Sequence, residues 1–107
     1  MARDDRARMQ RLTIMLQSRD RVHHHSLATE LLSRARHAGL AGATLLEAEQ
    51  GQGRSGVVHR QHLFKEDAPL SLVVVDDEAK IAAFLEDNAE LLAEAIVVVV
   101  DVVAFRA

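Results

Sequence analysis

The glycine-rich run Gly51-Gln-Gly-Arg-Ser-Gly is the segment with the clearest potential for binding chemistry. Glycines allow successive backbone N–H groups to turn toward an anion, and Arg54 adds a positive charge. The run lacks the Lys-Ser/Thr ending of a P-loop, and no helix start follows it. We predict a hairpin loop over residues 51–56 in which Gly51, Gly53, Arg54 and Ser55 contact a small anionic ligand. The alternative is a mobile hairpin loop without a ligand.

Histidines form a second group with possible chemistry. His23, His24 and His25 are consecutive, and imidazole is a common ligand of transition metals. Neighbouring side chains of an extended chain point apart, but His23 and His25 could share a face. A metal site at these two residues and a simple surface patch both remain open. His59 follows the glycine-rich run, and we expect it either to support the ligand or to serve as a hydrogen-bonded structural histidine.

Enzymatic chemistry has no recognisable residue set in this sequence. There is no Ser-His-Asp arrangement, no paired catalytic carboxylate motif and no nucleotide fingerprint. The chain has no cysteine, which excludes thiol catalysis and thiolate metal sites. We therefore expect a protein that is not an enzyme, and the residues by themselves assign no cofactor.

Composition limits the partners further. A net charge of −3 and the absence of Tyr and Trp argue against nucleic-acid binding by base stacking. The longest apolar run, Ile96–Val100, is far below the roughly 18 residues of a membrane helix. The charged N-terminus lacks the apolar region of a secretory signal. These features predict a cytoplasmic protein without membrane insertion.

The periodicity of apolar residues predicts the elements that position these side chains. Alternation of Leu12, Ile14 and Leu16 indicates a strand, and the spacing of apolar residues behind Ser26 indicates a helix that Gly39 ends. The expected elements are strand 10–17, helix 27–38, strand 43–49, hairpin arm 57–64, strand 70–75, a helix capped by Asp76 or Asp77 and carrying Ile81, Phe84, Leu85, Leu91 and Leu92 on its apolar face, and strand 96–105.

The order β-α-β-β-α-β predicts an α+β fold. The arrangement is that of a ferredoxin-like sandwich, with both helices on one face of an antiparallel sheet. Residues 1–8 alternate in charge without apolar periodicity, and we expect them to form a flexible tail. Residues 9–107 are then a single domain, as suits a chain of 107 residues.

Two apolar runs predict self-association. Leu72–Val75 and Ile96–Val100 do not alternate, whereas a strand with one wet face should do so. Two helices cover only one face of a sheet, so the other face needs a partner, and the simplest partner is another copy. The alternative is that valine merely favours strands at solvated positions.

Several segments resemble the DUF190 family of small bacterial and archaeal proteins, which are similar to PII signal-transduction proteins. The resemblance covers about residues 9–106. Its most specific parts are the Arg-Ala-Arg-His-Ala-Gly-Leu-Ala-Gly-Ala-Thr run at 34–44, the following Gly51-Gln-Gly, and Lys80-Ile-Ala-Ala-Phe-Leu. Shorter matches are Arg11-Leu-Thr-Ile, His59, Pro69-Leu, Val75-Asp76 and Asp101-Val.

This resemblance implies a PII-like homotrimer with a regulatory function. It implies that a small anionic ligand or an adenine nucleotide is sensed at the subunit cleft and signalled to a protein partner. The region between the second and third strands would correspond to the PII T-loop, although it is short here and has no tyrosine. The stretch before the last strand, 88–95, contains no glycine or base, and Glu90 and Glu94 would repel phosphate. A metal-binding trimer similar to CutA, using the cluster His23–His25, is the alternative.

Overall fold

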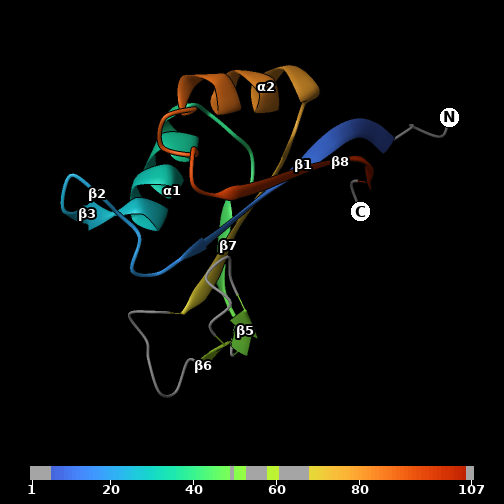
Figure 1. Cartoon of the computed structure of the whole chain (residues 1–107). Helices are drawn as coiled ribbons and strands as arrows, with labels where there is room; N and C mark the ends of the chain where they lie inside the picture. The colour runs from blue at the N-terminus through green and yellow to red at the C-terminus, as the bar shows by residue number, and fades with distance from the viewer. Residues whose placement is uncertain (1–5, 49, 53–57, 61–67, 106–107) are drawn as a thin grey trace, which may run out of the picture.

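The computed structural model describes residues 6–48, 50–52, 58–60 and 68–105. Two helices pack against a twisted sheet, and two small hairpins project from it (Figure 1). The elements are β1 Arg6–Gln17, β2 Arg21–Val22, β3 His25–Ser26, α1 Leu27–His37, β4 Thr44–Glu47, β5 Gln50–Gln52, β6 Val58–Arg60, β7 Pro69–Asp76, α2 Glu78–Asp87 and β8 Ile96–Phe105. No helix in the described ranges is long and apolar enough to cross a membrane.

The main sheet has four antiparallel strands in the order β4-β7-β1-β8. The register pairs Ile14 with Leu72 on one side of β1 and with Val97 on the other. Helix α1 lies in the crossover from β1 to β4, and α2 lies in the crossover from β7 that places β8 next to β1. This is the predicted ferredoxin-like α+β architecture.

The core lies between the helices and one face of the sheet. Leu12, Ile14 and Leu16 are buried, and they meet Leu70, Leu72 and Val74 of β7 in one cluster with residues of both helices. Because side chains alternate along a strand, these residues all lie on the same face. The predicted alternation of β1 is therefore confirmed, and both helices cover that face. The helix residues of the cluster are Ala28, Leu31, Ala35, Ile81 and Phe84.

The predicted tail boundary at residue 8 is wrong. Strand β1 begins at Arg6, and residues 6–8 pair with Phe105, Ala104 and Val103 of β8. These residues form a strand because they pair with β8, and not because one of their faces is buried. Their sequence therefore shows no apolar periodicity. Beyond Asp76 there is no β7 residue to pair with, so this end of β1 and β8 forms a two-stranded extension (Figure 1).

The predicted second helix is too long. Helix α2 ends at Asp87, and the following residues to 94 form turns. Leu91 and Leu92 still pack in or against the core, although they do so from these turns. Asn88 explains the early end: it is the C-cap residue, and its side-chain amide donates to the Phe84 carbonyl at 2.8 Å.

Helix α1 begins and ends as its sequence predicts. The Ser26 hydroxyl accepts a hydrogen bond from Thr29 N at 3.3 Å, and Gly39 follows the helix with a φ of +75°. The turn after Gly39 is fixed by Asp76 at the end of β7. This buried carboxylate accepts from Ala41 N and from Asp77 N, both at 2.7 Å. Asp76 therefore joins the end of α1 to the start of α2.

Asn88 also links the two helices. Its Oδ1 accepts a hydrogen bond from Arg34 Nη1 at 3.0 Å, while Nδ2 holds the last turn of α2. Replacing the buried Asn88 with alanine is expected to lower the free energy of unfolding by roughly 1–3 kcal/mol, because a buried helix end loses its partner. Urea unfolding measures this, and exposed Ala89→Ser next to it should change stability by about 0.5 kcal/mol or less. Equal stability of Asn88→Ala and wild type would contradict this role.

The second face of the sheet stays open in a single chain. We define the open face by the residues that point away from the helices, among them Met15, Ile96, Val98 and Val100. Their exposed fractions are 43%, 43%, 36% and 40%, which is high for apolar side chains of a sheet, and all of them except Met15 lie on the end strand β8. Strand β7 alternates strictly between buried and half-buried residues, so the helices cover only one of its two faces. The open face is thus the surface that the valine runs predicted to need a partner.

Candidate functional site

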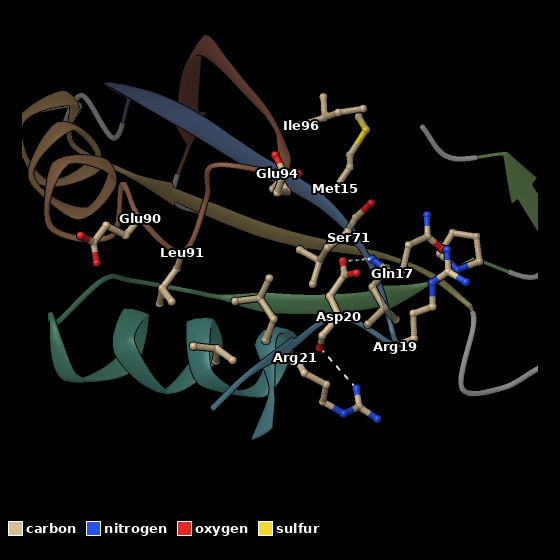
Figure 2. A pocket seen from close by; sticks show the side chains of 16 residues that line it. Met15, Gln17, Arg19, Asp20, Arg21, Ser71, Glu90, Leu91, Glu94 and Ile96 are labelled. Carbon is tan, nitrogen blue, oxygen red and sulfur yellow. Dashed lines mark hydrogen bonds between the residues drawn. The ribbon is translucent and has the colours of Figure 1, made fainter. Parts of the chain in front are cut away.

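A cavity of about 780 Å³ opens at one end of the sheet (Figure 2). It lies where β1 ends, where β7 begins, and where the connection between α2 and β8 passes them. This size is within the ordinary range for small-molecule sites. The cavity is lined by Met15, Leu16, Gln17, Arg19, Asp20, Arg21, Val22, Leu27, Pro69, Leu70, Ser71, Glu90, Leu91, Glu94, Ala95 and Ile96.

The loop that follows β1 is held rigidly at the cavity wall. Asp20 Oδ2 accepts from Gln17 N at 2.8 Å, and Asp20 O accepts from Leu27 N at 2.9 Å. Ser18 N donates to the Ala68 carbonyl at 2.8 Å, and Ser18 Oγ accepts from Ala68 N at 2.8 Å. These bonds tie the loop both to α1 and to the start of β7. The wall is therefore preorganised by backbone contacts.

Charged groups of both signs line the cavity. Arg21 Nη1 donates to the carbonyls of Ser18 and Asp20, which lays its guanidinium along the loop. Glu90 and Glu94 lie on the connection after α2 and line the cavity from that side. The sequence predicted that these two acids would disfavour phosphate, and the structure places both on the wall of this cavity.

Gln17, which lines the cavity, has one buried polar atom without a partner in the described part of the chain. Gln17 Oε1 is buried and accepts no hydrogen bond from the described residues. A buried acceptor without a donor costs roughly 1–3 kcal/mol.

Two of the predicted ligand residues lie in a hairpin near the cavity. Strands β5 and β6 form a separate two-stranded sheet in which Gly51 pairs with His59. Gly51 is thus a strand residue, and its predicted place in a loop is wrong, because the hairpin arms extend two residues further than the glycine content suggests. Gly53, Arg54 and Ser55 lie outside the described residues.

The hairpin arises at the same end of the sheet as the cavity. Ala48 N, just after β4, donates to the Pro69 carbonyl at 3.0 Å, and β5 contacts β7. Pro69 is also a cavity-lining residue. The predicted hairpin arm beyond Gly56 is confirmed for Val58–Arg60, whereas residues 61–64 lie outside the described part.

The histidine cluster forms a tight turn on the surface. His23 and His24 have φ values of +48° and +70° and connect β2 to β3, the geometry of a two-residue hairpin turn. His25 follows in β3, so the turn separates it from His23. Within the described ranges, no group of three or more His, Cys, Asp or Glu side chains could hold a metal ion.

The carboxylate of Glu30 already has a partner in Arg34, although it lies close enough to His23 and His25 for their charges to contribute to its lowered pKa. Arg34 Nε donates to Glu30 Oε2 at 2.8 Å, and this hydrogen bond lowers the pKa of the Glu30 carboxyl group. The pair is an ordinary i,i+4 interaction on an exposed helix surface. It gives the histidine turn no additional metal ligand.

The sequence did not identify most of the cavity. The expected strand 10–17 ends at Gln17, and the sequence analysis assigns no binding role to Arg19, Asp20 or Arg21. The signal that could have identified them is their position. Charged residues directly after a buried strand lie at the end of a sheet, where other connections also pass. The turns of residues 88–94 complete the site from a segment far along the chain.

Solved structures with this fold include PII-like proteins. The fold matches CPII, a nitrogen regulatory PII-like protein from Thiomonas intermedia K12 in a structure with ADP, AMP and bicarbonate, with a TM-score of 0.72, 21% identity, and coverage of 94% of this chain and 92% of that one. A putative PII-like signalling protein from Thermus thermophilus matches with a TM-score of 0.66, 20% identity, and coverage of 95% and 94%. CutA from Synechococcus elongatus PCC7942 matches at 0.61, with 12% identity and coverage of 92% and 81%. The fold is therefore PII-like.

The family follows from the sequence itself. The model of the DUF190 family, described as an uncharacterized ACR, matches residues 9–104, so the chain belongs to DUF190. A UPF0166 protein from Aquifex aeolicus (strain VF5) is 37% identical over 59 residues, which cover 53% of this chain. The match spans 56%, about half, of that relative's length.

Proposed function

We propose that this chain is a cytoplasmic, non-enzymatic PII-like regulator that acts as a homotrimer. In this proposal it binds a small anionic ligand, such as an adenine nucleotide, at the subunit cleft and reports the bound state to a protein partner. The observation that carries the proposal is the preorganised cavity at the end of a PII-like sheet, next to the hairpin that stands in the place of a T-loop. The fold likeness to CPII, whose structure contains ADP and AMP, supports an adenine nucleotide as ligand.

The cavity and the open face support the subunit cleft as the binding place. Met15 and Ile96 line the cavity and also belong to the open face, so the two surfaces are continuous. A second copy that covers the open face would therefore lie beside the cavity entrance. Ligand binding could then be reported through the adjoining hairpin, by ordering a segment that a partner recognises.

Calorimetric titration with a panel of adenine nucleotides tests the proposed ligand. At least one nucleotide is expected to bind with one site per chain, in protein whose trimeric mass has been verified. Arg54→Ala should weaken that binding about tenfold, because one charge-assisted contact is lost. The matched control is Arg36→Ala, since Arg36 is exposed in the last turn of α1 and does not line the cavity. A trimer that gives no heat with any nucleotide would overturn the nucleotide proposal.

A further inference from the structure

One charged side chain lies among the apolar residues of the open face. Arg11 pairs with Val75 of β7 and with Val100 of β8, so its side chain points to the same side of the sheet as theirs. It is the only charged residue among the described strand residues that point to this side. Its guanidinium has no hydrogen-bond or ion-pair partner among the described residues. A second copy that covers the open face must therefore supply an acceptor, because a buried charge without a partner is costly.

The open face of another copy is a poor source of that acceptor. Its described strand residues include no carboxylate, so two copies that met through their open faces would bring two Arg11 cations into one interface. Like charges that approach one another across an interface are unfavourable. An interface between two different surfaces of the chain avoids this, and such head-to-tail interfaces are the kind that closes cyclic trimers.

The helix side of β8 is a second apolar surface without cover. Val97 pairs with Ile14 and Val99 pairs with Leu12, so both valines point to the side on which the helices lie. They are nevertheless 36% and 39% exposed, and no residue of β8 belongs to the core cluster of the described chain. The helices thus do not reach over the end strand, and β8 needs cover on both of its faces.

This second surface carries an acid, whereas the open face carries a base. Asp101 pairs with Gln10 and follows Val99 on the helix side of β8, where it is exposed. Its Oδ1 accepts a hydrogen bond from Gln10 Nε2 at 3.0 Å, which orients the carboxylate and leaves Oδ2 for a second donor. Arg8 points to the same side, but it pairs with Val103, and no ion pair joins it to Asp101. Asp101 is the single acid of β8.

We propose that a second copy of this chain covers the open face with the helix side of its β8, and that the partner's Asp101 pairs with Arg11. Each chain offers both surfaces, so the same contact repeats around a ring and leaves neither charge without a partner. The valines supply the apolar area, and the ion pair selects one register between two otherwise featureless apolar surfaces. This inference rests on the homotrimer of the proposed function and specifies its interface, independently of the ligand.

Charge reversal at the two positions tests the pair. Arg11→Glu and Asp101→Arg each place like charges opposite one another in every interface. Each should raise the apparent dissociation constant of the assembly about tenfold or more. The double variant Arg11→Glu/Asp101→Arg restores opposite charges and should return to within about threefold of the wild type. Sedimentation velocity over a range of protein concentrations measures the constants, and circular dichroism verifies that each variant is folded.

Matched controls make the same charge changes outside both surfaces. Arg36→Glu lies in the last turn of α1 and Asp87→Arg lies at the end of α2, and both positions are exposed. Neither control should change the dissociation constant by more than about twofold.

Neutral variants provide a second measurement in case a reversal disturbs folding. Arg11→Gln and Asp101→Asn each remove one charge, and asparagine can still accept from Gln10. If the two side chains pair, the double neutral variant should dissociate no more readily than the weaker single variant.

The outcomes separate this inference from the proposed function. A wild-type trimer that neither reversal weakens would overturn the ion pair and leave the homotrimer intact. Weakening by Arg11→Glu but not by Asp101→Arg would mean that another group accepts from Arg11, and would overturn the assignment to Asp101. A double reversal that is weaker than either single variant would exclude direct pairing. A monomeric wild type would overturn the homotrimer together with this interface.

Discussion

Val98→Glu is expected to convert the proposed trimer into monomers. Val98 lies on the end strand β8, where it pairs with Thr13 of β1, and it belongs to the open face, with 36% of its surface exposed in a single chain. If another copy covers this face, each glutamate would be buried without a partner. The cost of burying unpaired charges, repeated in each subunit, should raise the dissociation constant by about 100-fold or more.

Sedimentation velocity over a range of protein concentrations measures this change. The matched control is Ala82→Glu, which adds the same charge at an exposed position of α2, on the opposite side of the sheet. Circular dichroism verifies that both variants are folded, which is expected because Val98 is not part of the single-chain core. A Val98→Glu protein that keeps the trimer mass at all concentrations would exclude the open face as the interface.

Asp76→Ala is expected to lower the free energy of unfolding by roughly 2–4 kcal/mol at neutral pH. The substitution removes a carboxylate that is 4% exposed and leaves the N–H groups of Ala41 and Asp77 without their acceptor. The neighbouring Asp77→Ala is a close control. Asp77 is exposed and makes no side-chain capping hydrogen bond, so its loss should cost about 0.5 kcal/mol or less.

The same carboxylate predicts a dependence of stability on pH. Burial raises the pKa of Asp76, but hydrogen bonds from Ala41 N and Asp77 N and the charge of Lys80 outweigh it, so the pKa is lowered from its ordinary value of 3.8. The unfolded chain then binds the proton more readily than the folded chain. The stabilisation is complete above about pH 4 and is lost as the pH falls through the lower folded pKa.

Denaturant unfolding between pH 2.5 and 7 separates this contribution. The difference in unfolding free energy between wild type and Asp76→Ala should be constant near neutrality and decrease below about pH 4. A difference that is the same at pH 2.5 and pH 7 would mean that the ionised form has no special role in the native state. Asp77→Ala should follow the wild-type curve throughout.

The fold was predictable because its strongest signals are local. Leu12, Ile14 and Leu16 alternate, and Ser26 and Gly39 mark the two ends of α1, so the pattern of each segment agrees with its final structure. Arg6–Arg8 and the first arm of the hairpin, β5, carried no such pattern. They become strands through pairing with another segment, and single-residue propensities contain little information about that partner.

The candidate site was harder to predict because it is assembled over long distances in the sequence. Gln17 and Asp20 meet Glu90 and Glu94 only after both crossovers have placed β8 beside β1. The acidic character of residues 88–95 was visible in the sequence, but the cavity that these acids line was not. Glycine content directed attention instead to residues 51–56, most of which lie outside the described residues.

Strand β8 affects the tendency of the chain to aggregate before it assembles. It is the end strand of the main sheet, and Ile96–Val100 is a five-residue segment of high β-propensity without charge or proline. Such segments, when exposed, are templates for cross-β aggregation. Asp101 interrupts the run immediately afterwards, and Gln10 Nε2 donates to its Oδ1 at 3.0 Å. This aspartate therefore has the position of a gatekeeper, which would keep newly made chains soluble until the valines find their proper partner.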